Sequence, residues 1–132
     1  METKWSKRLI QFSAIMGLIG AVLGSHMAGA GSLAFRPVHA HILVVGWLSV
    51  FAWGVYYKAY RVKDSKLVTV QAWTGIIGSI GLSVGLWMSY LQPFGDSKAL
   101  ILPIYIGGGT ILLVSFFLFM LVTFMTKSVD EK

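Results

Sequence analysis

Three histidines and one arginine lie close together in the first third of the sequence: His26, Arg36, His39 and His41. Imidazole is the commonest metal ligand in proteins, and the guanidinium of arginine binds carboxylates through two parallel hydrogen bonds. The chain contains no cysteine, which excludes disulfide scaffolds, thiolate zinc sites and iron–sulfur clusters. These four residues are therefore the one cluster in the sequence whose side chains suit metal or cofactor binding.

His39 and His41 lie in the segment RPVHAH, which begins at Arg36. Pro37 suits the first position of a helix, where its missing N–H costs nothing. On such a helix the two imidazoles would be about 200° apart, so they would serve two different sites rather than one metal ion. Arg36 precedes His39 by three residues and returns to a similar face of the helix.

A simpler interpretation treats these side chains as interfacial histidines in contact with water, with Arg36 reaching the lipid headgroups. The arginine, the histidine pair and a deeper Trp47 together favour the ligand interpretation. The position of His26 at the end of the first apolar segment allows a ligand role without requiring one.

The elements that position these residues are predicted from composition. The chain has 132 residues, of which 56% are hydrophobic and 12% charged, and its mean hydropathy is +0.75. A soluble domain is about a quarter charged, and a membrane-spanning helix needs about 20 apolar residues. Four segments qualify, at residues 9–28, 38–57, 67–91 and 100–125. Since the connections are short, we expect one domain, an all-α bundle of four antiparallel transmembrane helices.

The distribution of charge explains the formal net charge of +6. Under this assignment nine Lys and Arg residues lie on one side of the membrane and two on the other, Arg36 and Lys98. The nine are Lys4, Lys7, Arg8, Lys58, Arg61, Lys63, Lys66, Lys127 and Lys132. The positive-inside rule then predicts a multi-pass protein of the cell (inner) membrane with both termini in the cytoplasm. Nucleic acid is not needed to explain the positive charge.

The four predicted spans contain no aspartate or glutamate. Small four-helix exporters driven by proton exchange need a carboxylate within the membrane, so this class is disfavoured. Spaced glycines in the first and third spans, such as Gly20 with Gly24 and Gly81 with Gly85, are typical of close helix packing and of oligomerisation in lipid.

The segment RPVHAH, followed by Gly46-Trp47 and by GVYY at residues 54–57, resembles the haem-ligating helices of the haem–copper oxidase superfamily. It is most similar to nitric oxide reductases and C-family cytochrome c oxidases, and also resembles small four-span proteins of the subunit-I-like type. In the superfamily a twelve-helix subunit consists of three arcs of four helices, and a His-x-His pair contributes one imidazole to each of two haems.

This resemblance implies a homotrimer of the present chain that mimics the twelve-helix subunit. His39 of one copy and His41 of the next would bind a haem b from opposite sides near the outer face. Arg36 would pair with the haem propionates, and Trp47 would lie near the cofactor. The implied role is electron transfer with a redox partner, or haem or redox sensing.

The sequence also departs from the superfamily pattern. It has no counterpart of the copper ligands, of the adjacent histidine pair or of the redox tyrosine motif, and its third span offers Gln71 and Trp73 but no histidine. Oxygen reduction and proton pumping are therefore not implied, and the protein need not be an enzyme. Two alternatives stay open: a copper or other metal site formed by His39, His41 and His26, and a non-catalytic accessory subunit of a respiratory complex.

Overall fold

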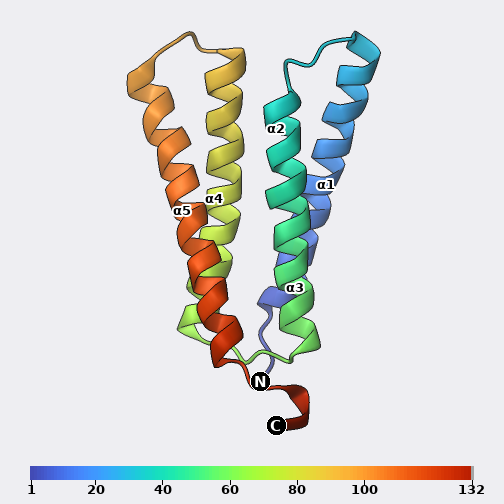
Figure 1. The fold of residues 1–132 in the computed structure, drawn as a ribbon, viewed down its shortest axis with the longest axis vertical. Coiled ribbons are helices and arrows are strands. Elements are labelled where there is room, and N and C mark those ends of the chain that lie inside the picture. Colours follow the sequence, from blue (N-terminus) through green and yellow to red (C-terminus); the bar gives the residue numbers. More distant parts are fainter. Residues whose placement is uncertain (132) are drawn as a thin grey trace.

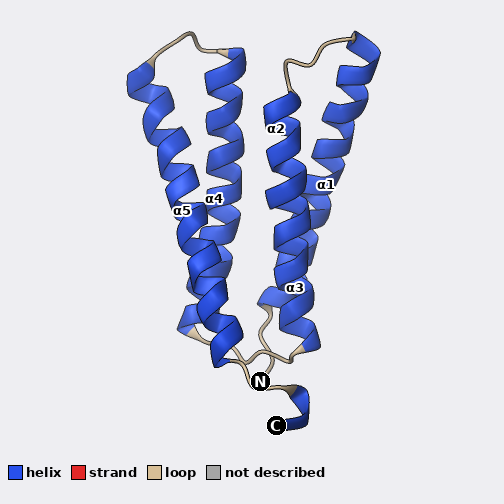
Figure 2. Ribbon diagram, viewed as in Figure 1, coloured by secondary structure: helices blue, strands red, loops and turns tan. Residues whose placement is uncertain are grey.

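The computed structural model describes residues 1–131, and the regular elements of this range are helical (Figure 1; Figure 2). They are α1 (Trp5–Ala30), α2 (Arg36–His41), the π-helix η1 (Ile42–Ser49), α3 (Val50–Ala59), α4 (Lys66–Leu91), α5 (Lys98–Met125) and the short 3-10 helix η2 (Val129–Glu131). Elements α2, η1 and α3 follow one another without a break and form a single span, Arg36–Ala59.

Four helices are thus long and apolar enough to cross a membrane, with 26, 24, 26 and 28 residues. This confirms the predicted all-α architecture with four candidate spans. Each helix begins or ends a few residues beyond the predicted bounds. Hydropathy detects only the apolar stretch, whereas the backbone hydrogen bonds of α1 continue through polar residues such as Lys7 and Arg8.

The spans form two hairpins that stand side by side (Figure 1). One hairpin pairs α1 with the span Arg36–Ala59, and the other pairs α4 with α5. Both chain termini lie at the same end of the bundle, and α2 begins at the opposite end (Figure 1). The candidate ligands of α2 are therefore at the end away from the termini, as an even number of spans requires.

Side chains of both hairpins meet in the half of the bundle near the termini. Trp53 of α3 is 3% exposed and packs edge to face against Phe116 of α5, with ring centroids 5.0 Å apart. The indole N–H of Trp5 in α1 donates to the hydroxyl of Thr69 in α4 at 3.2 Å. A smaller cluster formed by Met16, Val38, Ile42 and Leu86 lies in the other half. The hairpins are thus joined mainly near the termini.

Candidate cofactor site at the start of the second span

His39 is fixed against α1. Its Nδ1 lies 2.7 Å from the carbonyl oxygen of Gly20, and its half-buried ring covers Gly24. A Cβ added at Gly24 would lie 2.9 Å from His39 Cε1, so the ring fits because this position has no side chain. The spaced glycines of α1 therefore position an imidazole as well as packing the helices.

His41 is exposed and is held only by its own helix. Its Nδ1 lies 2.9 Å from the carbonyl oxygen of Pro37, one turn earlier. This carbonyl belongs to the first turn of α2, which begins at Arg36, so Pro37 is the second residue of the helix and not, as was predicted, the first. His39 and His41 thus differ in their support, since a neighbouring helix holds one and the local backbone holds the other.

The two hydrogen bonds determine the tautomer of both rings. A carbonyl oxygen can only accept, so Nδ1 of His39 and Nδ1 of His41 must each carry the proton and donate it. In a neutral imidazole Nε2 is then the unprotonated nitrogen, with a lone pair free for a metal. Metal-binding histidines commonly donate their second ring nitrogen to a backbone carbonyl, which fixes the ring orientation.

Arg36 and His26 flank this pair without joining it. Arg36 is exposed, and within residues 1–131 its guanidinium forms no hydrogen bond or salt bridge. His26 is exposed near the end of α1 and contacts Phe35 edge to face, with ring centroids 5.8 Å apart. The structure thus brings Arg36, His39 and His41 onto one short helix and places His26 on the neighbouring one.

Directly after His41 the span becomes a π-helix, a feature that was not predicted from the sequence. π-Helical segments are rare and occur frequently at functional sites. In a regular α-helix, Trp47 would be rotated about 80° away from His39. The wider turns of η1 keep His39, Leu43 and Trp47 all against α1, where they cover Gly24, Gly20 and Gly17 in turn. Trp47 remains 43% exposed on the other side of its ring.

An apolar groove lies on a different side of α2, between it and α4. It has a volume of about 250 Å³ and is lined by Leu23, Phe35, Val38, Ile42, Ser83, Val84 and Trp87. None of the candidate ligands lines it. This groove therefore does not enclose His39 and His41.

A buried polar cluster that the sequence analysis did not identify connects three of the helical elements. The hydroxyl of Tyr57 in α3 donates to Oε1 of Gln71 in α4, and Nε2 of Gln71 donates to Oγ of Ser115 in α5 at 3.2 Å. Ser115 in turn donates to the backbone carbonyl of Gln71 at 2.9 Å. Gln71 and Ser115 are fully buried. The signal was present, because a glutamine within an apolar span needs buried partners.

Within residues 1–131, no three His, Asp or Glu side chains are grouped so that they could hold a metal ion. No protein-family model matches the chain, and comparisons with curated proteins and with solved structures found no significant match.

Proposed function

We propose that this protein binds haem b within the membrane, through Nε2 of His39 and Nε2 of His41, and serves in electron transfer or redox sensing. The observation that carries the proposal is the shared tautomer. Both imidazoles donate Nδ1–H to a backbone carbonyl and keep the Nε2 lone pair free. This arrangement orients both rings and leaves the same nitrogen of each available as an iron ligand.

The two imidazoles bind the haem from different copies of the chain. His39 is turned toward α1, whereas His41 is two residues further along the helix and exposed, so one chain does not present both to a single porphyrin. A homotrimer in which His39 of each copy faces His41 of the next gives one bis-histidine site per chain. The exposed face of Trp47 would then contribute to the wall of this site.

The remaining polar partner is Arg36, which carries a guanidinium without an ion-pair partner in the described chain. It binds a haem propionate at the membrane surface, where bidentate geometry suits a carboxylate. Bound haem supplies one-electron redox chemistry, and two histidine ligands leave the iron no open position for a gas. Electron transfer therefore fits this ligand set better than oxygen reduction.

Absorption spectra of the gently purified protein, oxidised and reduced, test the proposal. We expect a Soret band and a sharp reduced α band at one haem per chain. His39→Ala and His41→Ala should each remove the low-spin spectrum because each deletes one axial ligand. His26→Ala is the matched control and should leave the spectrum unchanged, since His26 packs edge to face against Phe35 and is not one of the two proposed ligands.

Other results of these measurements would support one of the alternative functions. Stoichiometric copper without a Soret band, lost in all three histidine variants, would establish a metal-binding protein and refute haem binding. A protein without haem or copper, whose assembly is unaffected by His39→Ala and His41→Ala, would indicate an accessory subunit. A monomer that retains bis-histidine haem would refute the shared site.

We also propose that the chain lies in the cell membrane with both termini in the cytoplasm, as the positive-inside rule predicts. The absence of native cysteine makes single-cysteine labelling unambiguous. Asp96→Cys in the connection between α4 and α5 and Asp130→Cys near the C-terminus carry the same charge change, and both positions are exposed. A membrane-impermeant maleimide should label the first in intact cells and the second only after permeabilisation. The reverse labelling pattern would show that both termini lie outside the cytoplasm and would refute this topology.

A further inference from the structure

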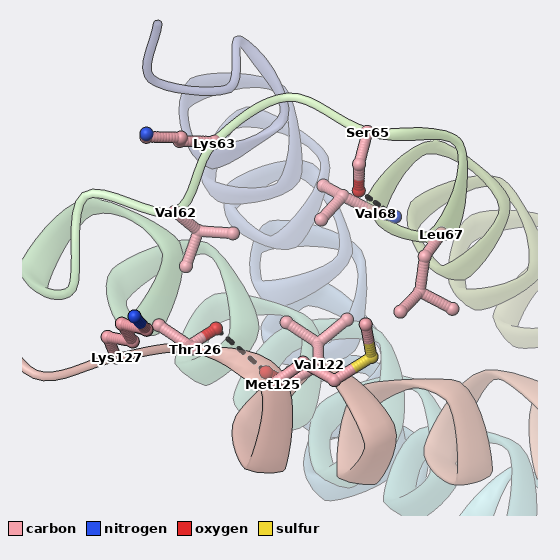
Figure 3. Close-up of a pocket in the computed structure, with 9 residues that line it drawn as sticks. All are labelled: Val62, Lys63, Ser65, Leu67, Val68, Val122, Met125, Thr126 and Lys127. Carbon is pink, nitrogen blue, oxygen red and sulfur yellow. Dashed lines mark hydrogen bonds between the residues drawn. The ribbon is translucent and has the colours of Figure 1, made fainter.

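A second pocket lies at the end of the bundle that holds the termini (Figure 3). It has a volume of about 390 Å³ and lies between the connection from α3 to α4 and the last turn of α5. Its walls combine apolar side chains, among them Leu67, Val122 and Met125, with the two lysines Lys63 and Lys127. It is on the opposite end of the spans from His39 and His41.

The residues that line this pocket carry a net positive charge. None of its lining residues is acidic, and within residues 1–131 neither Lys63 nor Lys127 forms a salt bridge. The acidic neighbour of Lys63 in sequence, Asp64, accepts a hydrogen bond from the Thr3 hydroxyl at 3.0 Å and lines a separate depression. An occupant that brings negative charge would therefore complete the site.

The hydroxyl groups of the pocket differ in what they can donate. Thr126 uses its hydroxyl hydrogen within its own helix end, donating to the carbonyl oxygen of Val122 at 2.7 Å. Ser65 caps α4 by accepting from the backbone N–H of Val68 at 3.2 Å, so its own hydrogen is left to donate (Figure 3). The pocket thus offers two ammonium groups and one hydroxyl donor, a set that suits a phosphate group.

The apolar wall decides what kind of phosphate compound fits. Met125 is 73% exposed and Leu67 only half-buried at the end of an apolar span, where lipid chains are the natural contact. A free inorganic anion would leave this wall uncovered, and a choline headgroup would bring its own cation beside two lysines. A diacyl lipid with a net negative headgroup satisfies the charge and covers the wall.

We propose that this pocket binds one anionic phospholipid of the membrane leaflet at the terminal end of the bundle. Its phosphate lies between the ammonium groups of Lys63 and Lys127 and accepts from the Ser65 hydroxyl. One acyl chain follows Leu67, Val122 and Met125 between α4 and α5. The lipid thereby joins the connection before α4 to the C-terminal end of α5.

Native mass spectrometry of the full chain in detergent tests the proposal, with phosphatidylglycerol and phosphatidylcholine of identical acyl chains as probes. We expect tighter binding of phosphatidylglycerol. A lysine near an anionic headgroup contributes about fivefold in affinity, so K63Q/K127Q should weaken phosphatidylglycerol binding by about 25-fold. Binding of phosphatidylcholine should be unaffected by the double substitution, because its headgroup has no net charge.

The matched control is K4Q/K7Q, which removes the same charge at the same end of the bundle from two exposed lysines outside the pocket. It should retain wild-type affinity for phosphatidylglycerol. Equal losses in the two double variants would show a general surface effect and overturn the specific site. Equal affinity of the wild-type protein for both lipids would overturn it as well.

Discussion

The two hairpins of this bundle use glycine for different purposes. In the hairpin of α4 and α5, four of the glycines face the backbone of the other helix, and the closest approaches are at Gly78, Gly81, Gly85 and Gly108. A Cβ at Gly78 would lie 2.6 Å from the nitrogen of Leu112, and one at Gly85 would lie 2.5 Å from Cα of Tyr105. In the hairpin of α1 and the second span, most of the glycines that meet the other helix face side chains, and Gly54, which also approaches backbone atoms of Ser6 and Ile10, is the exception. Gly17 lies under Trp47 and Gly24 under His39.

The difference separates close packing of two helices from the positioning of a ring side chain. Where backbone meets backbone, neither helix can move without losing the close packing that holds helices together in lipid. Where a ring packs over a glycine, the space left by the missing side chain sets the orientation of that ring. In the first hairpin the glycines of α1 thus accommodate the rings of His39 and Trp47, and in the second the glycines hold α4 close to α5.

The largest expected effect is in the second hairpin, at Gly108. A Cβ there would collide with backbone atoms of Gly81 and Leu82, which cannot be relieved by a rotamer change. Gly108→Ala should lower the free energy of unfolding by about 3 kcal/mol, the upper part of the range for overpacking. The measurement is an SDS titration of the detergent-solubilised protein followed by circular dichroism.

The neighbouring Gly107 is the control, since a Cβ there would have nothing within 4 Å. Gly107→Ala should leave the unfolding free energy unchanged or slightly raised, because alanine favours the helix. Equal destabilisation by both substitutions would show that α4 and α5 are not packed backbone against backbone.

The sequence was sufficient to predict the four spans and the role of small residues in packing. Length and hydropathy determine whether a helix can cross a membrane, and both can be counted directly. It was not sufficient to tell which glycines face backbone and which face a ring. Gly81 and Gly24 look alike as members of spaced small-residue pairs, and only the rotation of each helix separates their roles.

For the candidate site, the sequence predicted that His39 and His41 point apart, and their different partners agree with this. The carbonyl of Gly20 as the partner of His39 could not be predicted, because that contact depends on how α1 and α2 are aligned. The π-helix of Ile42–Ser49 was also missed. Its i→i+5 hydrogen bonds join backbone groups and require no particular residue types, so an apolar sequence does not reveal them.

In the first hairpin, an added methyl group should weaken haem binding rather than destabilise the fold. A Cβ at Gly24 would press on the imidazole of His39, which can tilt away. The tilt weakens the 2.7 Å hydrogen bond to Gly20, and loss of such an orienting bond typically costs at least tenfold in affinity. On the proposed function, Gly24→Ala should weaken haem binding by about tenfold, measured by haem titration of the apoprotein.

Gly29→Ala tests the specificity of this effect on the same helix, because a Cβ at Gly29 would meet nothing within 4 Å. Its haem affinity should match that of the wild type. If Gly24→Ala binds haem as tightly as Gly29→Ala while the protein remains folded, the Gly20 carbonyl does not orient a ligand. The glycines of α1 would then serve helix packing alone, as those of α4 and α5 do.

The smallest expected effect is at the link between the hairpins. Tyr57→Phe removes the hydroxyl that donates to Gln71 and leaves that buried amide oxygen without its donor. Hydrogen bonds between helices in a membrane contribute on average about 0.6 kcal/mol, because polar groups also find partners in the unfolded state. Tyr57→Phe should therefore lower the unfolding free energy by about this amount in the same SDS titration, whereas Tyr90→Phe, at a residue 62% exposed, should not change it. A loss as large as that expected for Gly108→Ala would mean that this polar link between the hairpins stabilises the fold as much as the glycine packing within the second hairpin does.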